Sequence, residues 1–272
     1  MNVGLFTTMT NPEDRNDPWK ESLACYEDIV DDVVVVGSDW PYEFSWDHIG
    51  KTFHSGFQQC KTDWVIRMDL DYFFHEKDLK RLHQALLEHK DVPAIAFPQY
   101  QFFSPERYQI KTLICIALNK KAFPSIKLNG GGDLCLPTID GKLINPWSVP
   151  IANIPVWQYD TVFRTKEIIS EDRARFARAW YRYFNDWGDR GGGTPEEAFE
   201  AWFNGVSSKY TKHTFKSKIE NHPKYIQKKL ASIKKDYFGY DLFGLKNNTT
   251  FKIKDTFKGY KLNKTIEYRS VI

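Results

Sequence analysis

Two carboxylates separated by one residue, Asp69 and Asp71, come directly after the apolar residues Val65, Ile66 and Met68. Such a run is typical of a buried strand, and alternate side chains of a strand share a face, so both carboxylates can point the same way. Two adjacent like charges are costly unless something neutralises them, and a hard divalent cation, Mn²⁺ or Mg²⁺, does so through oxygen ligands. The pair therefore predicts a metal site that could hold a diphosphate. The alternative is that the two acids only belong to an exposed turn and bind no metal.

The sequence around this pair predicts strands that alternate with helices. Short apolar runs and segments with helical spacing of apolar residues follow one another along the first third of the chain. Four valines at 33–36 predict a strand buried on both faces of a parallel sheet. The alternation predicts an α/β fold, Rossmann-like, with a mostly parallel central sheet flanked by helices. The predicted strands are residues 2–8, 32–37 and 63–68, and the predicted helices are residues 19–30, 48–60 and 77–89.

Polar side chains stand at the ends of all three predicted strands. The first strand ends in Thr7 and Thr8, the second is followed by Asp39, and the third by Asp69 and Asp71. Because the carboxyl ends of parallel strands meet at one edge, where open α/β sheets bind ligands, these groups are expected in one crevice.

The second half of the chain changes character. Further strands are predicted at 94–97, 101–103, 112–118 and 156–162, and helices at 168–186, 194–203 and 223–233. Thr194, Pro195 and Glu197 match the start of a capped helix. These elements predict a core at 1–165, a helical region at 166–245 and a polar Lys-rich tail at 246–272.

Composition limits the class of protein. The 272 residues carry a net charge of only +3, with lysines concentrated late, which fits a solvated face or a surface for phosphates, anionic lipid or an acidic glycan. The four cysteines form no C-x-x-C pair, which indicates reduced thiols. No signal peptide and no apolar stretch of about 20 residues is present, so we expect a cytoplasmic protein, with peripheral membrane contact through the basic C-terminal region as an option. No nucleic-acid partner is expected.

Strand, D-x-D and helix in this order resemble the GT-A nucleotide-sugar glycosyltransferases, in particular small family-2-type enzymes of bacteria or viruses. The resemblance covers about residues 1–120. It implies metal-dependent transfer of a sugar from a UDP-, GDP- or dTDP-sugar to a glycan or lipid-linked acceptor, with inversion favoured. Two rivals stay open, a nucleotidyltransferase acting on sugar phosphates and a non-catalytic carbohydrate-binding relative.

The resemblance also implies roles for individual residues around the nucleotide. Thr7 and Thr8 would bound its pocket, and Asp39 would accept from the base or ribose, unless Asp39 only forms a turn. Lys51 and Arg67 would help neutralise the diphosphate. The aromatics Trp40, Tyr42 and Trp46 would wall the pocket or cover the edge of the sheet.

Two further roles have more than one candidate. A third metal ligand, which some relatives add as a late histidine, would be His213 or His222. The base that takes the acceptor proton would be Asp172, in a Glu-Asp pair before an Arg-rich helix, or Asp133 after a glycine loop. The alternative for Asp172 is an ordinary acid near a helix start. The chain has no G-x-S-x-G, G-x-x-x-x-G-K-[ST] or H-E-x-x-H motif.

Overall fold

The computed structural model describes residues 1–38, 40–129, 136–210 and 214–245. Three of the predicted site residues, Asp39, Asp133 and His213, and the predicted tail therefore lie outside the described residues. Of the four cysteines, the three that are described are buried free thiols, as predicted: Cys25, Cys60 and Cys115.

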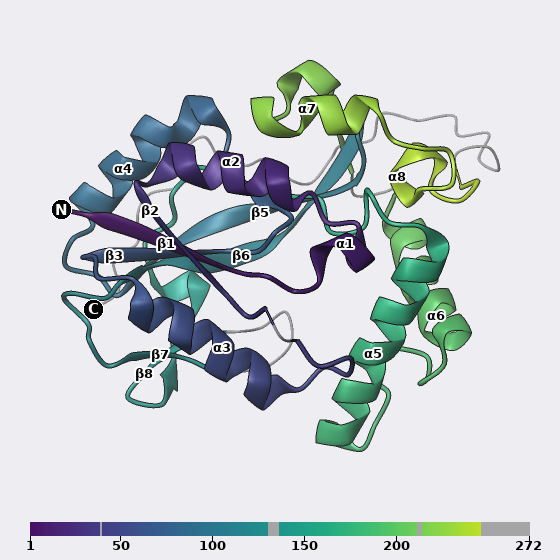
Figure 1. The fold of residues 1–272 in the computed structure, drawn as a ribbon, viewed down its shortest axis with the longest axis horizontal. Helices are drawn as coiled ribbons and strands as arrows, with labels where there is room; N and C mark the ends of the chain where they lie inside the picture. The colour runs from purple at the N-terminus through teal and green to yellow at the C-terminus, as the bar shows by residue number, and fades with distance from the viewer. Residues whose placement is uncertain (39, 130–135, 211–213, 246–272) are drawn as a thin grey trace.

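The first three strands form the parallel part of a central sheet, as the sequence predicted. They are β1 (Val3–Thr8), β2 (Asp32–Val36) and β3 (Trp64–Met68), and β1 lies between the other two. Their carboxyl ends point to the right-hand side of Figure 1, away from the N-terminus. This parallel register brings the segments that follow Thr8 and Met68 to one edge of the sheet.

The remaining strands make the sheet mixed. Its order is β2-β1-β3-β6-β5-β10-β4, and β11 also pairs with β6. Both β6 and β4 pair antiparallel with their neighbours, whereas β10 is parallel to β5. Most strands thus share one direction, and the predicted α/β class is confirmed. The bounds are β4 (Tyr72–Phe73), β5 (Ala94–Ser104), β6 (Arg107–Asn119), β10 (Val156–Gln158) and β11 (Phe215–Lys216).

Helices cover both faces of the sheet (Figure 1). One face carries α2 (Trp19–Ile29), α4 (Leu79–Glu88) and α7 (Lys224–Ala231), and the other carries α3 (Trp46–Gln59). The two hydrophobic clusters of the core follow this division, because one contains side chains of α2, α4 and α7 and the other side chains of α3. The sheet is therefore packed on both faces, which fixes the positions of the residues that follow its strand ends.

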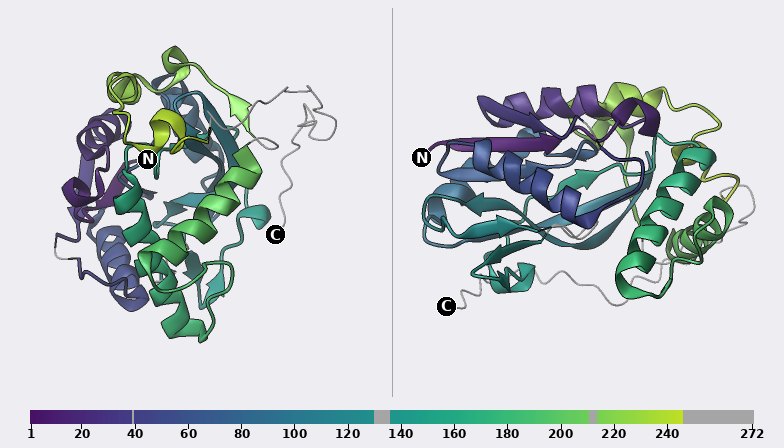
Figure 2. Two further views of the ribbon diagram at one scale, coloured as in Figure 1. Left: turned by 90° about the vertical axis from the view of Figure 1, so that its right-hand side faces the viewer. Right: turned by 60° about the horizontal axis from the view of Figure 1, so that its bottom comes forward.

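A second group of helices stands across the end of the sheet. It comprises α5 (Lys166–Phe184) and α6 (Pro195–Tyr210), with the short α1 (Pro12–Arg15) and α8 (Phe238–Asp241) beside them (Figures 1 and 2). The predicted cap of α6 is confirmed, since Thr194 Oγ1 accepts from the Glu197 amide at 3.3 Å and donates to its carboxylate at 2.9 Å. A small sheet of β7 (Ile126–Leu128), β8 (Pro137–Ile139) and β9 (Lys142–Leu143) completes the described fold.

Several local predictions were wrong. The valine-rich β2 is an edge strand and is partly exposed, because a continuous β-branched run does not reveal which strand ends the sheet. The strands predicted at 94–97 and 101–103 form one bulged strand, β5, and the strand predicted at 156–162 stops at Gln158. In α6 the helix continues to Tyr210, beyond the predicted end. No helix among the described residues is long and apolar enough to cross a membrane.

Candidate functional site

A cavity of about 430 Å³ lies at the carboxyl ends of the parallel strands. Thr8 at the end of β1 and the Asp69–Asp71 turn after β3 form part of its wall, as expected for an open α/β sheet. Further lining comes from α1, from the segment between β10 and α5, and from α5 itself. The ionisable residues that line it are Arg15, Asp17, Arg67, Asp69, Asp71, Lys111, Asp160, Arg164, Asp172 and Arg173.

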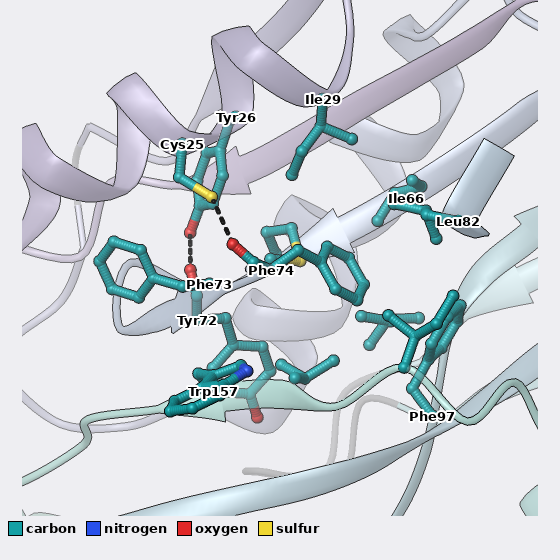
Figure 3. Close-up of a cluster of buried hydrophobic side chains, with 14 of the residues drawn as sticks. Cys25, Tyr26, Ile29, Ile66, Tyr72, Phe73, Phe74, Leu82, Phe97 and Trp157 are labelled. Carbon is teal, nitrogen blue, oxygen red and sulfur yellow. Dashed lines mark hydrogen bonds between the residues drawn. The ribbon is translucent and has the colours of Figure 1, made fainter. Parts of the chain in front are cut away.

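Helix α2 holds the turn that carries the two aspartates. The Tyr26 hydroxyl donates to the Asp69 carbonyl at 2.5 Å and lies 3.2 Å from the Tyr72 carbonyl, and Ser22 donates to the Leu70 carbonyl at 2.6 Å. Figure 3 shows Tyr26 and Cys25 directed at the backbone of Tyr72 and Phe74. Between the aspartates and the predicted helix, which is present as α4, the chain forms β4 and a 3₁₀ turn at Glu76–Asp78. The buried anchoring fixes where both carboxylates stand.

The two carboxylates differ in what they contact. Asp69 Oδ2 lies 3.2 Å from the Arg67 guanidinium, which is almost fully buried. For the side chain of Asp71, the described residues supply no hydrogen bond. Burial raises the pKa of Asp71 well above its ordinary value, and the nearby charges of Asp160, Asp69 and Asp17 raise it further. Asp71 is therefore a carboxyl group that a cation would stabilise.

In the lining from α1, the segment after β10 and α5, the central residue is Arg164, which is only 2% exposed. Its guanidinium donates to Asp17 at 2.5 Å, to Asp160 at 3.0 Å and to Asp172 at 2.9 Å. Its Nε donates to the Arg15 carbonyl at 3.1 Å. Arg164 therefore joins α1, the segment after β10 and α5 in one network.

Two of the three aspartates of this network, Asp160 and Asp172, each contact a further arginine. Asp160 accepts from Arg173 at 2.8 Å, and Asp172 accepts from Arg175 as well as from Arg164. Burial alone would raise the pKa of both carboxyls, but the surrounding arginines outweigh it and lower both pKa values. Both groups are therefore ionised at neutral pH without an added cation.

The predicted site residues divide into two sets. The cavity is lined by Thr8, Arg67, Asp69, Asp71 and Asp172. Within the described part of the chain, Thr7, Trp46 and Lys51 do not line it. Thr7 is fully buried because its side chain alternates with that of Thr8, and Lys51 lies on the exposed face of α3.

The aromatic residues after β2 differ in whether they line the cavity. Trp46 packs against α5, with ring centroids 4.6 Å from Tyr183 and 5.6 Å from Phe184. Trp40 instead lines the cavity, which fits the predicted wall of the pocket.

His222, one of the candidate third ligands, is engaged elsewhere. Its Nδ1 lies 2.7 Å from the Tyr159 hydroxyl and its Nε2 lies 2.7 Å from the Pro105 carbonyl, so neither ring nitrogen is available to a metal. Burial lowers the pKa of His222 to about 4, which keeps the ring neutral. Across the described ranges, no group of three His, Cys, Asp or Glu side chains is arranged to hold a metal ion. The prediction that His222 could be a ligand is therefore wrong.

Sequence reasoning missed several residues of this site. Asp160 follows strand β10 as Asp69 follows β3, and the overlong strand predicted at 156–162 hid this signal. Arg164 and Asp17 carried no local signal, because their pairing joins segments 147 residues apart. Gln99 and Gln158, which bond to each other at 2.8 Å on the cavity wall, look in sequence like ordinary strand residues.

Comparison with known proteins finds similarity only at the level of structure. No protein-family model matches the chain, and no curated protein matches it in sequence. Among solved structures, S. aureus TarS residues 1–349 is 11% identical, with a TM-score of 0.37 over 76% of this chain and 79% of that one. The same fragment in complex with UDP is 10% identical, with a TM-score of 0.36 over 91% of this chain and 87% of that one. No functional conclusion follows from matches this distant.

Proposed function

We propose that this chain is a nucleotide-sugar glycosyltransferase, which moves a sugar from a nucleotide-diphosphate donor to a hydroxyl of a glycan or lipid-linked acceptor. The observation that carries the proposal is the Asp71 carboxyl. It stands beside Asp69 at a strand end and lines a cavity, and its pKa is raised by burial and by the neighbouring carboxylates. Paired carboxylate oxygens suit Mn²⁺ or Mg²⁺, so the residues present fit a divalent cation.

The cavity offers a place for each part of such a donor. Asp69 and Asp71 would hold the cation, which would neutralise the diphosphate as the bond to the sugar breaks. Arg67 adds a fixed positive charge beside Asp69. The apolar side chains of Trp40, Ile49 and Phe53 line the same cavity near Thr8 and would surround the nucleoside.

For the acceptor proton, Asp160 is the carboxylate that we assign. It is ionised, it lines the cavity, and its charge is the largest Coulombic contribution to the raised pKa of Asp71. A base must stand near the sugar carbon, and that carbon is bonded to the diphosphate beside the cation. Asp172 remains the alternative, because it lines the same cavity.

The first experiment is a thermal unfolding series with UDP, GDP, CMP and dTDP, each with and without Mn²⁺. A ligand that binds only the folded chain raises its midpoint by mass action. We expect one nucleotide to raise the midpoint only with Mn²⁺, and Asp71→Asn to abolish the rise. Asp47→Asn, an exposed acid on α3, is the matched control and should keep it. The absence of any nucleotide effect on the wild type would refute the proposal.

Two further measurements sharpen it. Cleavage of the donor by water should release sugar and nucleoside diphosphate, whereas a nucleotidyltransferase would need pyrophosphate and would yield a nucleoside triphosphate and a sugar phosphate. If Asp160 is the base, Asp160→Asn should lower kcat about 100-fold or more while the nucleotide-dependent rise in midpoint is kept. An equal loss in Asp172→Asn with full activity in Asp160→Asn would reverse the assignment.

A further inference from the structure

A second cavity, of about 350 Å³, lies beside the first. The two share a wall made by Thr10, Arg15, Trp40, Phe44 and Asp172. The second cavity is bounded by the segment after β1, by the segment after β2 and by the first turns of α5. It is therefore adjacent to the proposed donor site without containing Asp69 or Asp71.

Tyr42 gives this second cavity a fixed aromatic surface. Its side chain is 64% exposed and lines the cavity, yet it is held at three points. The hydroxyl donates to Glu171 at 2.7 Å, the carbonyl accepts from Arg175 at 3.0 Å, and the Arg175 guanidinium lies 5.4 Å from the ring centroid. An aromatic ring that is exposed but already ordered binds a flat ligand face at low cost in entropy.

The charge on the cavity wall selects the kind of ligand. Four carboxylates, Asp14, Glu167, Glu171 and Asp172, face two guanidinium groups, Arg15 and Arg175. Both guanidinium groups are already engaged by Asp172, Arg15 at 3.5 Å and Arg175 at shorter range.

Glu171 is itself paired with Arg178 at 3.2 Å, whereas the described residues supply no ion pair to Asp14 and Glu167. These two carboxylates accept hydrogen bonds from hydroxyl or ammonium groups and repel anionic ones. Glu167 is held in its ionised form, because bonds from its own backbone amide and from Thr165 lower the pKa of its carboxyl. Among the described residues of this wall, no positive side chain is left to pair with a diphosphate or a uronate.

We propose that the second cavity binds the acceptor saccharide, and that this saccharide is neutral or carries an amine, not a carboxylate or phosphate. One sugar ring stacks on Tyr42, and its hydroxyl or ammonium groups donate to Glu167 and Glu171. The assignment as acceptor site rests on the proposed transferase function. The binding of a saccharide in this cavity can be measured without any turnover.

The test is a titration of three trisaccharides that differ in charge, followed by saturation-transfer NMR, with and without UDP and Mn²⁺. The probes are chitotriose, its fully deacetylated amine form and trigalacturonate. We expect both of the first two to bind at least tenfold more tightly than trigalacturonate. Tyr42→Ala should weaken their binding at least tenfold, and Glu167→Gln should weaken the amine form more than chitotriose. Tyr240→Ala, an exposed aromatic on α8 that lines neither cavity, is the control.

Each outcome separates this inference from the function on which it rests. Equal or tighter binding of trigalacturonate, no binding of any probe, or equal behaviour of Tyr42→Ala and Tyr240→Ala would overturn the acceptor assignment while leaving a nucleotide effect intact. A missing nucleotide effect, with normal saccharide binding lost in Tyr42→Ala, would instead overturn the transferase function and leave a saccharide site.

Discussion

Aspartates in two parts of the first cavity's lining have pKa values shifted in opposite directions. The strand-end wall comprises Thr8 and the Asp69–Asp71 turn, and the α5 wall comprises the lining residues from α1, the segment after β10 and α5. On the strand-end wall, the side chain of Asp71 has no hydrogen-bonded partner among the described residues, and burial raises its pKa. On the α5 wall, Asp160 and Asp172 each accept from two arginines and have lowered pKa values. Arginines of the chain itself neutralise the carboxylates of the α5 wall, whereas we expect Asp71 on the strand-end wall to be neutralised only by a bound cation.

This difference separates architecture from binding. Arg164, through Asp17 and Asp172, connects α1 to α5 and so fixes the shape of the cavity, which is a structural task. The side chain of Asp71 makes no such connection among the described residues. Its charge destabilises the unliganded fold, and unfavourable charges of this kind are typical of sites that bind a ligand. The following predictions test whether the two walls really differ in this way.

The largest effect is expected from Arg164→Met. Removing the guanidinium leaves three buried carboxylates without their shared partner, so the free energy of unfolding should fall by about 3–5 kcal/mol. Urea unfolding followed by circular dichroism measures the change. The control Arg182→Met removes a half-exposed pair with Glu43 and should cost at most about 1 kcal/mol. If the two variants lose equal stability, the α5 wall is not a structural hub.

Asp71→Asn should act in the opposite direction. Without metal, the variant should be at least as stable as wild type at pH 7, because it removes a like charge from beside Asp69 and Asp160. With Mn²⁺ at one hundred times its Kd, the wild type should gain about 2.7 kcal/mol and the variant nothing. Unfolding curves with and without Mn²⁺ decide it, and a metal-free variant clearly less stable than wild type would contradict the comparison.

Asp172→Asn should show a pH-dependent cost. The lowered pKa means that ionised Asp172 stabilises the fold above its unfolded pKa of about 3.9, and that this contribution is lost as the pH falls through the folded value. The variant should therefore be less stable than wild type by about 1–3 kcal/mol above pH 5, and the gap should narrow as the pH falls below about 4 and close only below the folded pKa. A gap that does not change with pH would mean that Asp172 acts by packing alone.

The smallest effect is expected from Glu43→Gln, which removes ion pairs with Arg178 at 2.6 Å and with Arg182 at 3.1 Å, both between the segment after β2 and α5. These pairs are partly exposed, so the variant should lose at most about 1 kcal/mol, and less at 1 M salt than at 0.1 M. Unfolding at the two salt concentrations checks it. A salt-independent loss above 2 kcal/mol would place this contact with the buried network.

The strand-end wall could be predicted from sequence because its signals are local. The apolar run before Asp69 and Asp71 predicts a strand, and the two carboxylates after it predict a metal site, so both signals lie in one short segment. The parallel register then brings Thr8 to the same edge without further information. Local pattern and fold class were together sufficient for this half of the site.

The α5 wall could not be predicted in the same way. Asp172 was chosen for its Glu-Asp context, but its partners Arg15 and Arg164 come from distant segments that no periodicity connects. Trp46 and Lys51 were misplaced for a related reason. Their spacing located α3, whereas the packing of α5 decided that Trp46 faces its aromatic residues instead of the cavity.

The bond between Arg164 and Asp17 also bears on when the site forms. Its partners are 147 residues apart, and contacts of such long range incur a large loop-closure cost and form late in folding. As the chain is synthesised, Asp17, Asp69 and Asp71 exist before the arginines of α5 do. Arg15 and Arg67 can already balance Asp17 and Asp69 within the first half of the chain. Arg164 arrives only with the second half, so we expect the cavity to be closed last and only by a complete fold.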